Sequence, residues 1–232
     1  MSLPRNRETV LANLEEVRSR IGRACTKANR DPGAVRLVAA TKTVDPEAIG
    51  WVRDAGLGEV GENYVKELRD KRAFLDGLIW HFLGTLQSHT AHVVAEHADV
   101  VQTLVPGNAV VRLARRAAER GGSLPALIEV DFTSERTGLA PEDVERFADE
   151  VAGTAGLELA GLMTIPPPAA SSEGARPWFV KLRELRDLVA SAHPKATELS
   201  MGMSLDYEVA VEEGATMVRI GTALFGARPS LA

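Results

Sequence analysis

The sequence predicts a single (β/α)8 barrel, the TIM-barrel fold, on three observations. Short apolar strands alternate strictly with helical segments after residue 33, and eight strands with seven intervening helices can be counted. The first strand is followed by Lys42 rather than by a Gly-rich turn, which disfavours the doubly wound open sheet, the alternative fold. With 232 residues we expect one domain spanning 1–232.

The elements follow in order along the chain. An amphipathic helix over about 5–29 ends before Pro32 and Gly33. The predicted strands are 35–41, 59–61, 80–84, 100–104, 126–132, 157–165, 197–201 and 217–221. Helical patterns between them start near Pro46, Asn63, Ser88, Asn108, Pro141, Arg176 and Ser204. Because little sequence follows the eighth strand, we expect the N-terminal helix to cover the flank that an eighth helix would occupy.

Composition excludes several classes of protein. The net charge of -5 argues against a nucleic-acid binder, and the arginines at 112, 115, 116 and 120 have the spacing of a solvated helix face. The single cysteine, Cys25, excludes an internal disulfide framework and is typical of a reducing compartment. No apolar run is long enough to span a bilayer, and the N-terminal residues lack the pattern of a secretory signal. We therefore expect a cytoplasmic protein without a membrane partner.

Lys42 is the first candidate for chemistry, because it is a lone cationic residue at the end of the apolar run 38–43. Desolvation at a strand end favours the neutral amine, which is the nucleophile that captures an aldehyde or ketone as a Schiff base. A surface lysine that happens to follow a strand is the alternative interpretation.

Two later loops suit a phosphate group. In a barrel of this kind the functional residues gather at the C-terminal strand ends, and phosphate commonly lies between the loops after strands seven and eight. Residues 200–204 (SMGMS) offer hydroxyls, a glycine and the start of a helix, and residues 220–222 (IGT) offer backbone amides with a hydroxyl. A lysine from strand one facing these loops is the arrangement that would hold pyridoxal 5'-phosphate (PLP).

Several motifs in order resemble one known family. They are ATK at 40–42, GENYV at 61–65, WHFLG at 80–84, LQS at 86–88, GLM at 161–163, LSMGMS at 199–204 and the segment 217–226. These residues resemble the pyridoxal phosphate homeostasis proteins of the YggS and PROSC type, over nearly the whole chain to Arg228. The resemblance implies a fold type III PLP-binding barrel, similar to the N-terminal barrel of alanine racemase.

The resemblance also implies the cofactor site. The implied cofactor-binding residues are Lys42, Asn63, His81, Met163, Ser200, Arg219, Gly221 and Thr222. Of these, Lys42 would form the Schiff base, and Ser200, Gly221 and Thr222 would hold the phosphate. Arg219 would face the pyridine nitrogen, and the remaining three would line the pocket. No catalytic residue and no metal ligand are implied; four histidines lie within 81–97, but no cysteine or closely spaced carboxylate completes a metal site.

Arg219 indicates a carrier rather than an enzyme. A guanidinium stays protonated and can only donate hydrogen bonds, so a ring nitrogen opposite it stays unprotonated. Such a pyridine is a poor electron sink, which suits holding PLP better than stabilising a carbanion. The resemblance implies intracellular PLP homeostasis as the function, with delivery to apo PLP-dependent enzymes by a monomer. A racemase-like PLP enzyme and a Schiff-base aldolase are the alternatives.

The chain departs from the family pattern at three places. Val44 stands where many members have a second lysine, and His89-Thr90 follows LQS where the family often has Asn-Lys. The segment 134–138 lacks a lysine often present before its glycine. A secondary cofactor site or transfer path that uses those lysines is therefore not expected here.

Overall fold

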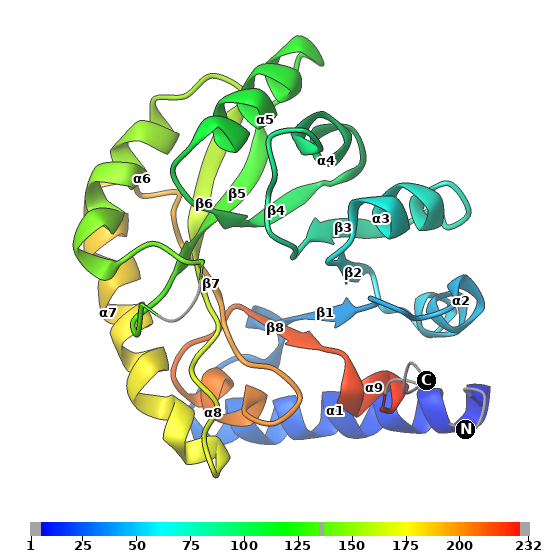
Figure 1. Cartoon of the computed structure of the whole chain (residues 1–232). Helices are drawn as coiled ribbons and strands as arrows, with labels where there is room; N and C mark the ends of the chain where they lie inside the picture. The colour runs from blue at the N-terminus through cyan, green and yellow to red at the C-terminus, as the bar shows by residue number, and fades with distance from the viewer. Residues whose placement is uncertain (1–5, 135–136, 228–232) are drawn as a thin grey trace.

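The computed structural model is a closed barrel of eight parallel strands in the order β1 to β8, ringed by helices (Figure 1). It describes residues 6–134 and 137–227. Residue 5, part of the segment 134–138 and Arg228 therefore lie outside the described residues. The predicted (β/α)8 fold is confirmed, and strand β1 pairs with β2 on one side and β8 on the other.

The strands and helices alternate as the sequence predicts. The strands are β1 Arg36–Ala40, β2 Glu59–Glu62, β3 Ile79–Phe82, β4 Val100–Leu104, β5 Leu124–Val130, β6 Leu157–Thr164, β7 Glu198–Ser200 and β8 Met217–Ile220. The helices are α1 Arg7–Lys27, α2 Pro46–Asp54, α3 Val65–Arg72, α4 Ala91–His97, α5 Asn108–Glu119, α6 Val144–Ala152, α7 Arg176–Ala192, α8 Tyr207–Glu212 and α9 Thr222–Phe225.

Three helices begin later than their sequence patterns suggest. Helix α3 starts two residues after Asn63, and α4 and α8 start three residues after Ser88 and Ser204. In each case the residues before the helix form the loop at the C-terminal end of a strand. The predicted helix at Pro141 begins as a 3-10 turn, Pro141–Asp143, which leads into α6.

Helix α1 covers the flank beside β8 and β1, as predicted. Its apolar face is formed by Val10, Leu14, Val17 and Ile21, all buried. Figure 1 shows α1 running past α8 and the short α9. Hydrogen bonds fix this packing, among them one of 3.0 Å from Asn13 Nδ2 to the carbonyl of a residue in α9, Leu224. The four-residue α9 and the long α1 together take the place of a full closing helix.

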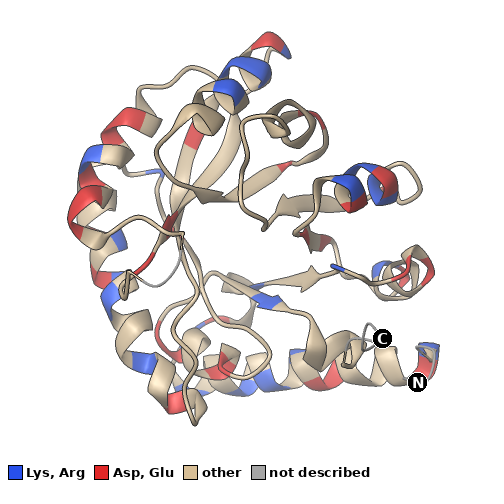
Figure 2. Cartoon of the chain, in the orientation of Figure 1, with Lys and Arg blue, Asp and Glu red and all other residues tan. Residues whose placement is uncertain are grey.

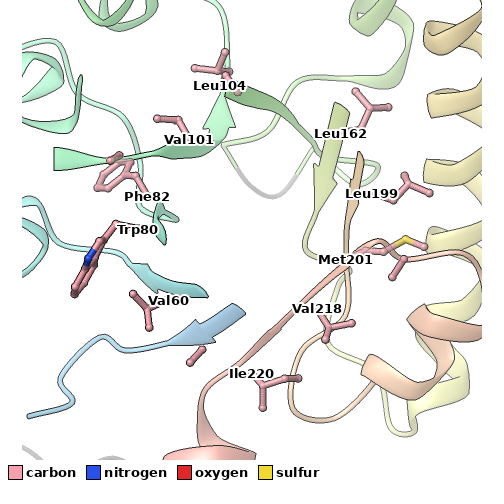
Figure 3. Close-up of a cluster of buried hydrophobic side chains, with 14 of the residues drawn as sticks. Val60, Trp80, Phe82, Val101, Leu104, Leu162, Leu199, Met201, Val218 and Ile220 are labelled. Atoms are coloured by element: carbon pink, nitrogen blue, oxygen red, sulfur yellow. The ribbon is translucent and has the colours of Figure 1, made fainter. Parts of the chain in front are cut away.

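The barrel has an outer and an inner core. Side chains that point outward from the strands pack beneath the helices, as the ten labelled residues of Figure 3 illustrate. A separate inner cluster consists of Val38, Leu127, Met163 and Met217, from four different strands. Successive side chains of a strand alternate between its two faces. Because Val38 points into the barrel, every second residue of β1, counted from Val38, points inward as well. This alternation places the functional residues described below.

Charged residues lie mainly on the surrounding helices, and the strands carry few of them (Figure 2). Within the described ranges, no helix is both long and apolar enough to cross a bilayer. Over the same ranges no group of three His, Cys, Asp or Glu side chains is placed to hold a metal ion.

Candidate functional site

A shallow hollow opens where β1 and β8 end. It is lined by Ala40, Lys42, Val44, Gly221, Thr222, Phe225 and Gly226, and we call it the Lys42 hollow. The two strands run in parallel with Ala39 opposite Ile220, so the turn that carries Lys42 lies next to the loop that follows β8. A Cβ atom at position 221 would lie 3.3 Å from the carbonyl oxygen of Ala40, so the loop after β8 passes close to the end of β1 at this glycine. Three predicted site residues, Lys42, Gly221 and Thr222, are thus brought together.

The loop after β7 lies against the loop after β8. The hydroxyl of Ser204 accepts a hydrogen bond of 3.1 Å from the backbone amide of Ala223. The carbonyl of Gly202 accepts one of 2.9 Å from the amide of Arg219. Gly202 has a φ of +91°, and a Cβ there would lie 2.5 Å from that of Ala210, so only glycine fits. These contacts place the Ser204 hydroxyl beside the first residues after β8.

Arg219, in β8, lies two residues before Gly221 and faces the inside of the barrel, where it is buried. Its guanidinium donates hydrogen bonds of 2.7 Å to Ser200 Oγ and 3.0 Å to the carbonyl of Thr164. Burial lowers the pKa of Arg219 to about 10, although the charges of Glu129 and Asp206 oppose the shift. Arg219 therefore remains cationic at neutral pH, and it forms a fixed positive group inside the barrel beside Ser200 and Thr164.

A chain of hydrogen bonds crosses the barrel from Arg219. Ser200 Oγ donates to Gln102 Oε1 at 2.6 Å, and Gln102 Nε2 lies 2.8 Å from His81 Nδ1. His81 Nε2 lies 2.9 Å from Glu59 Oε2. We call this series, from Arg219 to Glu59, the interior chain.

Because Arg219 can only donate hydrogen bonds, it determines which atom donates and which accepts in each hydrogen bond of the interior chain. Arginine only donates, so Ser200 accepts from it and gives its single hydroxyl proton to the Gln102 carbonyl oxygen. The Gln102 amide nitrogen then donates to His81 Nδ1, and His81 carries its proton on Nε2 and donates it to Glu59. Although burial acts in the opposite direction, the hydrogen bond from His81 and the nearby charge of Arg36 hold the pKa of Glu59 below its ordinary value.

The remaining predicted residues occupy different levels of the barrel. Asn63 lies in the loop after β2, where its Nδ2 donates to the carbonyl of Leu83 at 3.3 Å. Met163 belongs to the inner cluster, and His81 is fully buried with both ring nitrogens hydrogen-bonded in the interior chain. Ser200 is also fully buried, and its only proton is already donated to Gln102. In this arrangement the Ser200 hydroxyl has no proton left to donate to a phosphate.

Sequence reasoning missed Gln102 and Glu59, and it included Ser204 only as one of the hydroxyls of the loop 200–204. Gln102 and Glu59 belong to the interior chain, and Ser204 faces the loop after β8. One signal was present for Gln102, because it is an amide in the middle of the largely apolar segment Val100–Leu104. An uncharged polar residue at such a position has to be hydrogen-bonded inside the protein. Its partners, however, are far away in the sequence.

Known proteins similar to this chain agree with one another. A family model described as the alanine racemase N-terminal domain matches residues 6–229. A pyridoxal phosphate homeostasis protein of Aquifex aeolicus is 40% identical over 220 residues, covering 93% of this chain and 96% of the relative. Its counterpart in Pseudomonas aeruginosa is 40% identical over 228 residues, covering 95% of this chain and 96% of the relative.

Solved structures give the same picture. The structure of PipY from Synechococcus elongatus with PLP bound has a TM-score of 0.79 and 33% identity, covering 89% of this chain and 100% of PipY. An alanine racemase of Clostridium difficile has a TM-score of 0.78 but 15% identity, covering 100% of this chain and 64% of the racemase, and it shows the fold alone. The extent and identity of these matches confirm the resemblance seen in the sequence motifs. The chain belongs to the alanine racemase N-terminal domain family, and within it to the pyridoxal phosphate homeostasis proteins.

Proposed function

We propose that this protein binds PLP covalently through the amine of Lys42 and takes part in PLP homeostasis, without turning over a substrate of its own. The observation that carries the proposal is that Lys42 shares one hollow with Gly221 and Thr222, which follow the strand that contains the buried cation of Arg219. The names of the relatives and the PLP bound to PipY support the same assignment.

The residues around the hollow fit the parts of the cofactor. PLP supplies an aldehyde, which an amine can capture, and a phosphate, which needs hydrogen-bond donors. Thr222 and Ser204 offer hydroxyls, and the loop containing Gly221 offers backbone amides. We assign Ser200 to Arg219 instead, because its proton is already donated to Gln102. Arg219 would face the pyridine nitrogen as a donor.

The proposal also includes Asn63, His81 and Met163, which the sequence resemblance assigned to the lining of the pocket. Asn63 follows β2 as Lys42 follows β1, and the pairing of Ala40 with Gly61 brings these two loops to the same edge. Met163 and His81 would act from below, as members of the inner cluster and the interior chain. His81 would then influence the site through Ser200 and Arg219 rather than by touching the ring.

A spectroscopic experiment tests the function. Protein mixed with PLP should show a visible absorption band, and borohydride should convert the bound cofactor to a permanent adduct on the peptide containing Lys42. The Lys42→Ala protein should fold and form no such adduct, whereas Lys66→Ala, a change at an exposed lysine in α3, should behave like the wild type. A protein that stays colourless with PLP and is trapped by borohydride only with a sugar or a keto acid would instead be an aldolase.

The finer parts of the proposal concern partners and location. We propose that the protein acts as a cytoplasmic monomer that passes PLP to apo PLP-dependent enzymes. Light scattering after size-exclusion chromatography tests the monomer, since a dimer would have twice the mass of 24.9 kDa. Delivery is tested by activating a PLP-free enzyme with loaded protein, compared with the same amount of free PLP. Equal activation rates, in the presence of a scavenger of free PLP, would contradict the direct transfer.

A further inference from the structure

A buried cluster of charged side chains from β2 and α3 binds the turn that contains Lys42. Lys71 Nζ, from α3, donates to the carbonyl of Thr41 at 2.7 Å, to Glu62 Oε1 at 2.6 Å and to Glu67 Oε2 at 2.6 Å. The hydroxyl of Thr41 donates to the same Glu62 oxygen at 2.7 Å. We call these three charged residues the Glu62–Glu67–Lys71 cluster. It joins the end of β2 and helix α3 to the residue before Lys42.

The cluster also binds the residue after Lys42. The backbone amide of Thr43 donates to Glu67 Oε2 at 2.9 Å. Thr43 has a φ of +61°, in the left-handed region that residues with a Cβ seldom adopt. A non-glycine residue keeps this conformation only where surrounding contacts impose it. The hydrogen bond to Glu67 is such a contact, so the backbone is tied down on both sides of Lys42.

The burial of the cluster indicates that it does more than hold the fold together. The side chain of Glu62 is 0% exposed and that of Lys71 is 8% exposed. Burying these charges costs solvation free energy, and well-packed apolar side chains of similar volume commonly stabilise a protein as well or better. What an apolar replacement could not supply is the set of directed hydrogen bonds to the carbonyl of Thr41 and the amide of Thr43. Those bonds fix a backbone geometry, and the residue between them is Lys42.

We propose that Glu62, Glu67 and Lys71 are positioning residues for Lys42, which hold its backbone so that its amine meets an incoming aldehyde in the hollow. The inference rests on the proposed function, in which Lys42 is the amine that captures PLP. None of the three side chains needs to touch the cofactor, since each acts through the turn 41–43. Helix α3 thereby helps to set the reactivity of a residue that follows β1.

The experiment compares variants that loosen the turn with a control on the same helix. Glu67→Ala removes the acceptor for the Thr43 amide, and Glu67→Gln restores a carbonyl oxygen that can accept from both Thr43 and Lys71. Because Lys71→Met alone would leave Glu62 buried without its cation, the double variant Glu62→Gln/Lys71→Met is used to remove the whole buried pair. Arg72→Met is the control, since Arg72 is next to Lys71 in α3 but pairs with Asp99 on the other side, at 2.6 Å.

Two readouts are measured on each folded variant. The first is the rate at which PLP becomes fixed to Lys42 by borohydride, and the second is the hydrogen exchange of the Thr43 amide without PLP. Glu67→Ala and the double variant should trap PLP about ten- to a hundredfold more slowly than the wild type, because misplacement of a reacting group by about 1 Å has effects of that size. Exchange at Thr43 should accelerate. Glu67→Gln should recover most of both properties, and Arg72→Met should change neither, even where its denaturation midpoint falls.

The outcomes separate this inference from the proposed function. If the wild type itself forms no adduct at Lys42, the proposed function fails. Should the wild type form the adduct while Glu67→Ala and the double variant trap PLP at its rate, the positioning role is wrong and the function stands. Equal slowing by Arg72→Met would also overturn the positioning role, because it would trace the effect to general loosening of α3.

Discussion

Replacing Ser200 with alanine is the sharpest test of the interior chain. The serine is fully buried, and its hydroxyl joins the guanidinium of Arg219 to the amide of Gln102. The change deletes one oxygen and leaves a buried charged donor and a buried acceptor without their partner. A hydrogen bond to a charged group contributes about 1.5 to 3 kcal/mol and a neutral one about 0.5 to 1.5 kcal/mol. We therefore expect the free energy of unfolding of the cofactor-free protein to fall by about 2 to 4 kcal/mol.

Urea denaturation followed by tryptophan fluorescence measures this loss, and Ser204→Ala is the matched control. Ser204 is only partly buried, and the one hydrogen bond it accepts, from Ala223, predicts a loss of about 0.5 to 1.5 kcal/mol. In cofactor binding, by contrast, we expect the phosphate-specific effect from the Ser204 variant and not from the Ser200 variant. Ser204→Ala should lose most of the preference for PLP over pyridoxal, and Ser200→Ala should weaken the binding of both ligands alike.

Two results would refute this reasoning. A Ser200→Ala protein as stable as the wild type, within about 0.5 kcal/mol, would mean that the hydroxyl does not bridge Arg219 and Gln102. A selective loss of phosphate preference in Ser200→Ala, with none in Ser204→Ala, would return Ser200 to the phosphate role that the sequence suggested.

Three further predictions follow from other residues. The PLP-loaded protein should not exchange the α-proton of alanine in heavy water; exchange that depends on Lys42, at about 1 per second or faster, would indicate an enzyme. Since the pKa of Glu59 is lowered in the folded protein, its contribution to stability is present above its ordinary value of 4.5 and is lost as the pH falls below it. Denaturation curves of wild type and Glu59→Gln should therefore converge on acidification, and a constant gap between them would contradict the shift. Tyr207→Phe should leave stability unchanged or raise it by up to about 1 kcal/mol, because the buried hydroxyl has no hydrogen-bond partner among the described residues; a loss above about 1 kcal/mol would reveal a partner.

The sequence predicted the barrel because the alternation of strands and helices can be recognised even when the ends of individual elements are predicted a few residues off. The strand β4 was predicted at its observed bounds, and β7 was predicted at 197–201 but spans Glu198–Ser200. The start of α8 was placed three residues early, at Ser204. There the Met203 amide is bonded to the carboxylate of Asp206, and the Ser204 hydroxyl accepts from Ala223, so the loop continues before the helix begins. The second of these contacts is tertiary and leaves no local signature.

The candidate site also has one part that the sequence could predict and another that it could not. Lys42, Gly221 and Thr222 follow the ends of two strands that neighbour each other once the barrel closes, so topology alone predicts their meeting. Ser200 and Gln102 are separated by 98 residues, and their contact depends on the stagger between strands that do not pair with each other. A list of polar residues at strand positions cannot supply that stagger. The hydrogen bond between Ser200 and Gln102 was therefore visible only in three dimensions.

Helix α1 has a consequence for how the chain is made. Its partners include the last elements of the barrel, α8 and α9, as in the hydrogen bond between Asn13 and Leu224, which are 211 residues apart. At a synthesis rate of roughly 5 to 20 residues per second, α1 leaves the ribosome roughly 10 to 40 s before α9 exists. Its stripe of Val10, Leu14, Val17 and Ile21 has no finished surface to pack on during that interval. Helix α1 is made before every other element of the barrel and is thus among the last to be buried, and nascent chains halted before β8 should be held by chaperones along this stripe.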